Sequence, residues 1–316
     1  VLDPRTRLIL FKLLNHGVLA RIDGCLSTGK EANVYFAVGA DGATELAVKI
    51  YKTSILVFRD RDKYVSGEYR HRRGYCRSNP RKMVKVWAEK EMRNLRRLSA
   101  AGIPSPAPLL VKNNVLVMAF LGTGGWPAPR LRDAQIGPRR MQSAYAQCVC
   151  HMRAMYHRCR LVHGDLSEYN LLFHEGRVVV IDVSQSMEHD HPRAMDFLRV
   201  DCRNVTDFFR RQGCVMLSAR ALFAFVVDAD LPSHLADDGM GAMHPQERQR
   251  FEALLAAAAD EGEAPQRPGD SVDDAVFMSS FIPRSLYEVE DFEAKHAAMR
   301  ANPGATAGAA AVSQML

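Results

Sequence analysis

The sequence HGDLSEYN, which spans His163–Asn170, and the run VVVID, which ends at Asp182, are the most informative parts of this chain. Asp165 lies five residues before Asn170, and Asp182 follows that asparagine by twelve residues, after a β-branched run. Phosphoryl transfer from ATP uses such a set. One carboxylate orients the attacking hydroxyl, while an amide oxygen and a second carboxylate hold Mg²⁺ against the phosphates. An ordinary surface loop can contain the same residue types, but the spacing of Asp165, Asn170 and Asp182 favours a phosphotransferase.

The composition is that of an ordinary folded protein. Of the 316 residues, 47% are hydrophobic and 25% are charged. No hydrophobic run approaches the roughly 18 residues of a membrane-spanning helix, so we expect no membrane association. The seven cysteines are irregularly spaced and fit reduced thiols in a cytoplasmic protein better than a disulfide framework. Because the chain begins with Val1 instead of Met, we expect it to be part of a longer protein, and we expect a monomer.

The positive charge is concentrated in one part of the chain. The formal net charge is +6, and residues 52–97 alone contain 15 Lys and Arg against 5 Asp and Glu. A solvated helix face can be basic without binding anything. The density of cations in the segment Arg70–Lys85 nevertheless favours a polyanion partner, although no RNA-binding module accompanies it.

The order of expected elements indicates an α+β fold with two lobes, similar to a protein kinase. Helical spacing predicts a helix over Arg5–Asn15. Strands are expected at Val18–Ile22, Ala32–Val38, Glu45–Tyr51, Pro108–Val111 and Val115–Phe120, and a long helix begins after Asn79 as N-cap, with Pro80 at its first position. A linker over Gly122–Pro129 then leads to helices at 139–159, 192–212 and 218–227.

These elements divide the chain into five parts. Residues 1–121 form a nucleotide-binding β-rich lobe with the basic insertion 52–97, and residues 122–227 form the mainly helical lobe with the catalytic and metal-binding loops. The stretch 228–275 is acidic and is expected to be a loop or partly disordered. Residues 276–300 are expected to be ordered, especially Phe277–Phe292, and 301–316 form a low-complexity tail.

Two further segments complete the expected nucleotide site. Lys49 lies in LAVKI, which is similar to the kinase strand whose lysine contacts the α- and β-phosphates and pairs with a glutamate on the next helix. That helix offers Glu89 and Glu91. We prefer Glu91, because leucines four and seven residues later place it on the inner face.

The segment Gly24–Lys30 has the glycine spacing of a Walker A loop. Glu31 stands where Ser or Thr would bind Mg²⁺, and a strand follows in place of a helix. We therefore predict a strand–turn–strand flap in which Ser27, Thr28, Gly29 and Lys30 contact ATP.

The segment His189–His191 could suggest a metal site, because two histidines in a strand would share a face. No further ligand is clustered with them and Pro192 follows, so a loop and helix-cap role is favoured.

Long motifs resemble the RIO family of atypical protein kinases, most closely its first subgroup. The resemblance runs from about residue 8 to residue 212, with a weaker match at Phe281–Leu286. It is carried by Ser27–Tyr35, Ile50–Ser54, Asp60–Tyr64, Asn79–Met83, Trp87–Leu95 and Ile181–Ser186.

The resemblance implies a role for each residue of the site. Asp165 would be the catalytic aspartate, and Asn170 and Asp182 would bind Mg²⁺. Asp182 would also accept a phosphate as an aspartyl-phosphate. The hinge Val117–Leu121, with Met118, Ala119 and Leu121, would bind adenine through its backbone.

The resemblance also implies a kinase fold without a peptide-docking activation segment, and a role in late maturation of the small ribosomal subunit. The partners would be the pre-ribosomal particle and its RNA. In agreement, the chain has no Asp-Phe-Gly and no Ala-Pro-Glu. One departure is Gly164, where the subgroup is expected to have Ala, and we expect this to have little consequence.

Two other functions compete with this one. His-Gly-Asp-Leu is also the loop of small-molecule phosphotransferases of the aminoglycoside-kinase type, although the basic insertion and the flap argue against that class. The chain could also be a non-catalytic, kinase-shaped scaffold, but the intact set of Lys49, Asp165, Asn170 and Asp182 argues against loss of chemistry.

Overall fold

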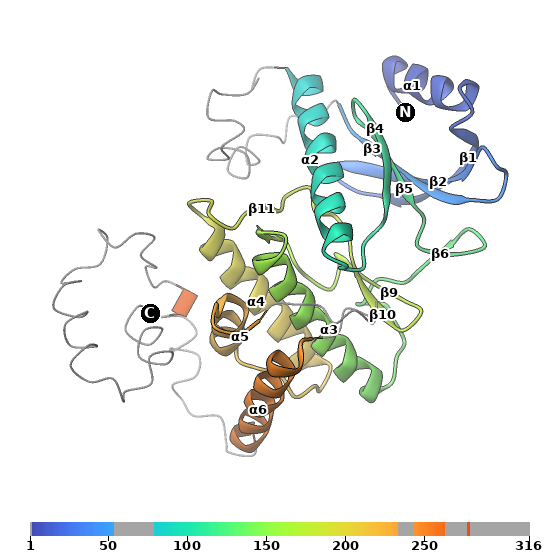
Figure 1. The fold of residues 1–316 in the computed structure, drawn as a ribbon. Coiled ribbons are helices and arrows are strands. Elements are labelled where there is room, and N and C mark those ends of the chain that lie inside the picture. The colour runs from blue at the N-terminus through green and yellow to red at the C-terminus, as the bar shows by residue number, and fades with distance from the viewer. Residues whose placement is uncertain (1, 54–78, 233–242, 263–276, 279–316) are drawn as a thin grey trace.

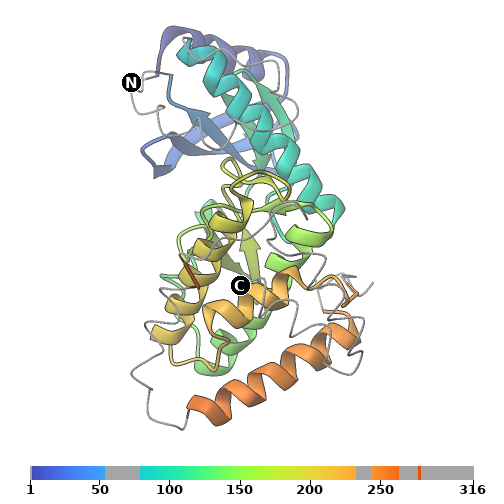
Figure 2. The same cartoon turned by 90° about the vertical axis from the view of Figure 1, so that its left-hand side faces the viewer.

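The computed structural model describes residues 2–53, 79–232, 243–262 and 277–278. Its two lobes confirm the expected α+β, kinase-like class. A β-rich N-lobe lies above a mainly helical C-lobe, and the long helix α2 (Pro80–Ala100) runs from the first toward the second (Figures 1 and 2). No helix among the described residues is long and apolar enough to cross a bilayer.

The N-lobe is built on one antiparallel sheet of five strands in the order β1-β2-β3-β5-β4. The strands are β1 (Leu19–Thr28), β2 (Ala32–Gly39), β3 (Glu45–Tyr51), β4 (Pro108–Lys112) and β5 (Val115–Ala119). All five predicted strands are confirmed, and β1 is longer than expected because pairing with β2 continues through bulges to Thr28. Helix α1 (Pro4–Asn15) begins at Asp3, whose carboxylate accepts from the Arg5 and Thr6 N–H groups.

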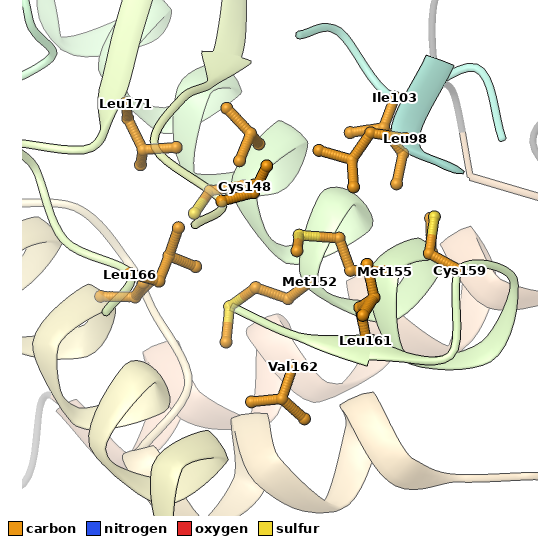
Figure 3. Packing of buried hydrophobic residues seen from close by; sticks show 14 of the residues in the cluster. Leu98, Ile103, Cys148, Met152, Met155, Cys159, Leu161, Val162, Leu166 and Leu171 are labelled. Carbon is orange, nitrogen blue, oxygen red and sulfur yellow. The ribbon is translucent and has the colours of Figure 1, made fainter. Parts of the chain in front are cut away.

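Helix α2 begins as the sequence predicts. The Asn79 side chain accepts from the N–H groups of Arg81 and Lys82, and Pro80 occupies the first turn. The apolar face of the helix belongs to a core cluster that extends into both lobes. Near the end of α2, Leu98 and Ile103 lie close to Met155 and Leu161 of the C-lobe (Figure 3). The packing of this one helix therefore joins the two lobes.

The C-lobe core lies among three helices, α3 (Pro138–His157), α4 (Ala194–Arg211) and α5 (Ala219–Val227). These confirm the three predicted helices within a few residues at each end. Two short antiparallel pairs carry the loops of the site. They are β9 (Leu171–His174) with β10 (Arg177–Val180), and β8 (Leu161–Val162) with β11 (Met187–Glu188).

Two expectations are corrected. The linker 122–129 contains a small hairpin of β6 (Gly122–Thr123) and β7 (Trp126–Pro127), whose turn uses Gly124 and Gly125 at positive φ. The stretch 228–275, expected to be a loop, contains the helix α6 (Pro245–Gly262).

A buried ion pair explains why α6 packs on the C-lobe. The Arg153 Nε on α3 lies 2.5 Å from the Glu247 Oε1 on α6, and both side chains are almost fully buried. The acidic composition of this stretch suggested a solvated loop. Glu247, however, is buried in the core and does not face water. Of the predicted ordered segment Phe277–Phe292, only residues 277–278 are described, and the tail lies outside the described residues.

Candidate active site

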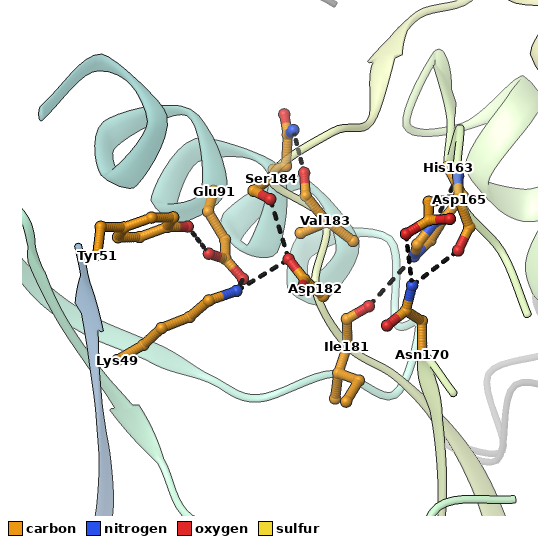
Figure 4. A network of polar contacts seen from close by, with 11 residues as sticks. Lys49, Tyr51, Glu91, His163, Asp165, Asn170, Ile181, Asp182, Val183 and Ser184 are labelled. Carbon is orange, nitrogen blue, oxygen red and sulfur yellow. Dashed lines mark hydrogen bonds and ion pairs between the residues drawn. The ribbon is translucent and has the colours of Figure 1, made fainter. Parts of the chain in front are cut away.

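A buried ion pair links the N-lobe sheet to helix α2. Lys49 of β3 donates from Nζ to Glu91 Oε1 at 2.8 Å, and both side chains are buried (Figure 4). Glu89, the other candidate, instead lies 3.8 Å from Lys85 in a partly exposed pair one turn apart on α2. The structure therefore places Glu91, and not Glu89, next to the lysine.

Asp182 joins this pair from the C-lobe. Its Oδ1 accepts from Lys49 Nζ at 2.9 Å and from Ser184 Oγ at 2.9 Å. Burial opposes ionisation, but the charge of Lys49 outweighs it and holds the pKa of Asp182 at about 2. Asp182 also adopts φ 55°, a left-handed conformation that is uncommon for a residue with a side chain and is concentrated at functional sites.

Tyr51, two residues after Lys49 on β3, donates its hydroxyl to the second oxygen of Glu91, Oε2. Burial raises the pKa of Tyr51 well above its usual value, so the phenol stays a donor. Burial also raises the pKa of Glu91, while Lys49 opposes that shift. For Lys49, burial favours the neutral amine, but the two carboxylates outweigh it and raise the pKa.

The loop that the sequence predicts to be catalytic holds Asp165 and Asn170 together. Asn170 Nδ2 donates to the Asp165 carbonyl oxygen at 2.8 Å and to Asp165 Oδ2 at 3.1 Å. The Asn170 backbone is itself fixed, because its carbonyl accepts from the Ile181 N–H at 3.0 Å. Partial burial raises the pKa of Asp165, and the Asn170 hydrogen bond opposes the shift. This loop and the segment before Asp182 are therefore directly connected.

Asp201 of α4 fixes the backbone of the same loop. Its two carboxylate oxygens accept from the Gly164 and Leu166 N–H groups, each at 2.8 Å. Burial raises the pKa of Asp201 to about 8, against the effect of these two donors. Gly164 has φ +79°, a conformation that glycine adopts without a Cβ clash, so the glycine fits this loop.

The flap has the predicted strand–turn–strand form, with β1 and β2 antiparallel on either side of residues 29–31. The Gly29 N–H donates to the Ala32 carbonyl at 2.9 Å, and Lys52 Nζ donates to the Gly29 carbonyl at 2.5 Å. The helix that a Walker A loop would open is absent here, since β2 follows the turn directly. Ser27 and Thr28 end β1, and Lys30 is exposed in the turn.

The predicted hinge Val117–Leu121 contains the last three residues of β5 and the two residues that follow the strand. Met118 is buried, the Ala119 N–H donates to the Ala107 carbonyl at 2.8 Å, and the Leu121 carbonyl accepts from the Ala128 N–H at 2.9 Å. These two hydrogen bonds fix the hinge backbone. The adenine-binding role of Met118, Ala119 and Leu121 stays a prediction.

The histidines at 189–191 serve the loop before α4. His191 Nδ1 accepts from the Arg193 N–H at 3.1 Å, and no cluster of three or more metal-binding side chains exists among the described residues. Only residues 187–193 separate Ser186 from helix α4, which begins at Ala194. A long activation segment is therefore missing at this position.

A model of the RIO domain matches residues 33–222, which is more than half of the chain. This chain belongs to the RIO domain family. The match includes Lys49, Glu91, Asp165, Asn170 and Asp182.

Curated relatives align with the RIO domain and beyond it. Serine/threonine-protein kinase RIO1 of Homo sapiens is 52% identical over 93% of this chain and 50% of its own length. The protein of the same name from Saccharomyces cerevisiae is 42% identical over 92% of this chain and 63% of its own length. The chain spans about half the length of the first of these relatives.

Solved structures agree with the RIO fold. A crystal structure of the Rio2 kinase–ADP/Mg²⁺–phosphoaspartate complex from Chaetomium thermophilum is similar with a TM-score of 0.54 and 20% identity. The similarity covers 81% of this chain and 76% of that chain. At this level of identity the likeness shows the kinase-like fold alone.

Three residues of the RIO site were missed by sequence reasoning: Tyr51, Asn94 and Asp201. Asn94 Nδ2 donates to the Val183 carbonyl at 2.8 Å, and so ties α2 to the segment that carries Asp182. The sequence did contain a pattern that could have identified Asp201 and Asn94. Both are polar residues on the buried face of an amphipathic helix, where each needs a specific partner.

Proposed function

We propose that this RIO domain binds ATP with Mg²⁺ and transfers its γ-phosphoryl group, as an atypical serine/threonine kinase or ATPase. The observation that carries the proposal is the junction at Lys49, whose Nζ meets Glu91 from one lobe and Asp182 from the other at 2.8 and 2.9 Å. A buried, charged lysine beside a carboxylate of the metal-binding type is the arrangement that phosphoryl transfer requires. The names of the relatives as kinases support it.

Different groups of the protein would bind different parts of ATP. The hinge at Ala119 and Leu121 would hold adenine, and the flap Ser27–Lys30 would cover the phosphates. Lys49, oriented by Glu91, would contact the α- and β-phosphates. Asp165 would accept the proton of the attacking hydroxyl or water as the oxygen of that nucleophile bonds to the γ-phosphorus, while the bond to the β–γ bridging oxygen breaks and ADP leaves.

The donors of the site fit Mg²⁺. Asp182 supplies a carboxylate that is ionised at neutral pH, and Asn170 supplies an amide oxygen, because its Nδ2 is directed at Asp165. Mg²⁺ binds through one or two carboxylates together with the nucleotide's own phosphates, so a cluster of three protein ligands is not needed. Bound there, the ion would neutralise charge on the phosphates.

The test compares wild type with Asp165→Asn. Wild type should hydrolyse ATP slowly, and only with Mg²⁺. The variant should lose turnover by a factor on the order of a hundred, which is typical of general base loss, and keep its ATP affinity, because Asp165 acts on the nucleophile. Turnover at the wild-type rate in the variant would refute the assignment.

We also propose an aspartyl-phosphate at Asp182. Its free carboxylate oxygen would bond to the γ-phosphorus while the bond to the β–γ bridging oxygen breaks and ADP leaves. Labelled ATP should give hydroxylamine-sensitive label that is lost in Asp182→Ala. Label that resists hydroxylamine would instead indicate phosphoserine, and Ser66 and Ser78 would be the first sites to examine.

The last part of the proposal concerns location and partner. We propose that the domain acts in the cytoplasm on a small-subunit ribosome precursor and contacts its RNA through the segment Arg70–Lys85. Residues 70–78 lie outside the described residues, but Arg81, Lys82 and Lys85 are exposed on α2. Reversing Arg72, Arg73, Arg77 and Lys82 to Glu should weaken RNA binding and flatten its salt dependence, because fewer counterions are released. Unchanged binding would exclude this surface.

The competing small-molecule phosphotransferase has its own test. A panel of aminoglycosides and sugars should not accept phosphate from ATP in the presence of the protein. A phosphorylated panel member would favour that class, and ATP binding without any turnover would favour the scaffold.

A further inference from the structure

The strand β3 presents two side chains to one carboxylate. Lys49 and Tyr51 are two residues apart, so they project from the same face of the strand. Lys49 Nζ binds Glu91 Oε1 at 2.8 Å, and the Tyr51 hydroxyl binds Glu91 Oε2 (Figure 4). Together they fix both oxygens of Glu91, and with them the rotation of its carboxylate.

Lys49 has a second carboxylate within reach. Asp182 Oδ1 is 2.9 Å from Lys49 Nζ, almost the same distance as Glu91. In the proposed reaction, however, the lysine must be directed at phosphate oxygens while Asp182 serves the metal. A firmly held Glu91 is therefore needed to keep the lysine in place.

We propose that Tyr51 is a positioning residue that holds Glu91 so that Lys49 is directed at the nucleotide phosphates. The proposal rests on the proposed ATP site and extends it by one residue. Tyr51 would not touch the nucleotide, and it would act through Glu91.

The buried surroundings of Tyr51 make its hydroxyl important for holding Glu91. Tyr51 is only 1% exposed, so water cannot take its place as a donor to Glu91. Lys49 Nζ also lies 5.3 Å from the centre of the Tyr51 ring. Replacement by phenylalanine keeps the ring, its packing and this cation–π contact, and removes the hydroxyl, which donates to Glu91 and also has a hydrogen bond with Ser184. A buried carboxylate oxygen is then left without a partner.

The experiment measures the affinity of Tyr51→Phe for ATP with Mg²⁺ and for adenosine. Adenosine has no phosphates, so its binding does not depend on Lys49. The Kd for ATP should rise on the order of tenfold or more, as expected for a lost hydrogen bond to a charged group, and the Kd for adenosine should not change. Tyr145→Phe is the matched control. It also removes a buried hydroxyl, which accepts from the Leu217 N–H far from this site.

A double variant tests whether Tyr51 acts through Glu91. Adding Tyr51→Phe to Glu91→Gln should not weaken ATP binding further, because the orientation is already lost. Three results would overturn the proposal: equal losses for ATP and adenosine, an unchanged ATP affinity, or full additivity in the double variant. A wild type that binds ATP without turnover would refute the proposed catalysis, yet the affinities would still decide the role of Tyr51.

Discussion

Replacing Asp201 by asparagine should disturb the proposed catalytic loop while leaving the proposed nucleotide-binding groups of the N-lobe in place. In the wild type, the two carboxylate oxygens accept from the Gly164 and Leu166 N–H groups at 2.8 Å each. Asparagine keeps one acceptor oxygen and places an NH₂ group against the other N–H. One buried donor is then left without an acceptor, which costs about 1–3 kcal/mol of unfolding free energy.

The effect on catalysis should be larger than the effect on binding. Asp165 lies between the two anchored residues, so its carboxylate shifts when either anchor is released. Displacement of a catalytic group by about 1 Å can cost on the order of a hundredfold in rate. We therefore expect kcat to fall by roughly tenfold to a hundredfold, with little change in ATP affinity.

Urea denaturation and Mg²⁺-dependent ATP turnover measure the two effects. Asp196→Asn is the control, because Asp196 is exposed in the first turn of the same helix. The free energy of unfolding of this control should fall by less than about 1 kcal/mol, which is the size of a helix-dipole contribution. If Asp201→Asn matched this control in both stability and kcat, the anchoring role of Asp201 would be refuted.

Three further predictions concern stability. Glu247→Gln leaves the Arg153 guanidinium buried without its carboxylate and should lower the free energy of unfolding by about 3 kcal/mol, measured by urea denaturation. The control Glu252→Gln, on the exposed side of α6, should lower it by almost nothing, and equal losses would contradict a stabilising role for the Arg153–Glu247 pair. Burial lowers the pKa of His151 to about 4, so the unfolded chain binds a proton that the native chain does not, and stability should fall as the pH drops from about 7 toward 4. His151→Gln should flatten that dependence, and an identical pH profile would exclude His151 as its source. Gly164→Ala should cost about 1–2 kcal/mol by denaturation, because φ is +79° there, and a neutral result would show that the loop can relax.

Local patterns in the sequence were sufficient to locate the strands and the first turn of α2. The alternation in Glu45–Tyr51 and the Asn79 cap depend only on neighbouring residues, and the structure agrees with both. The helix α6 was missed for the opposite reason. Its position depends on Glu247 meeting Arg153, 94 residues earlier in the chain, and an acidic, alanine-rich stretch gives no local sign of that contact.

The same distinction applies to the site. Lys49, Asp165, Asn170 and Asp182 belong to compact motifs and were selected from the sequence. Tyr51 was not, because its role depends on a partner 40 residues away on another element. Its position two residues after Lys49 placed it on the correct face, but only the structure shows that Glu91 offers it a second oxygen.

Helix α2 shows how this fold can hold its site without a long segment between Ser186 and α4. Three positions spaced three residues apart make three different connections. Glu91 meets the sheet through Lys49, Asn94 donates to the Val183 carbonyl, and Arg97 forms two hydrogen bonds with Glu188 at 2.7 and 3.0 Å.

Val183 and Glu188, the partners of Asn94 and Arg97, lie at the two ends of the segment that follows Asp182. The helix that carries the partner of Lys49 therefore also holds the segment that follows Asp182 at two points. Since these contacts are made by the domain's own helix, the Lys49–Glu91 pair can form without an added phosphate on an activation loop. We expect the proposed ATP site to be assembled as soon as the domain folds.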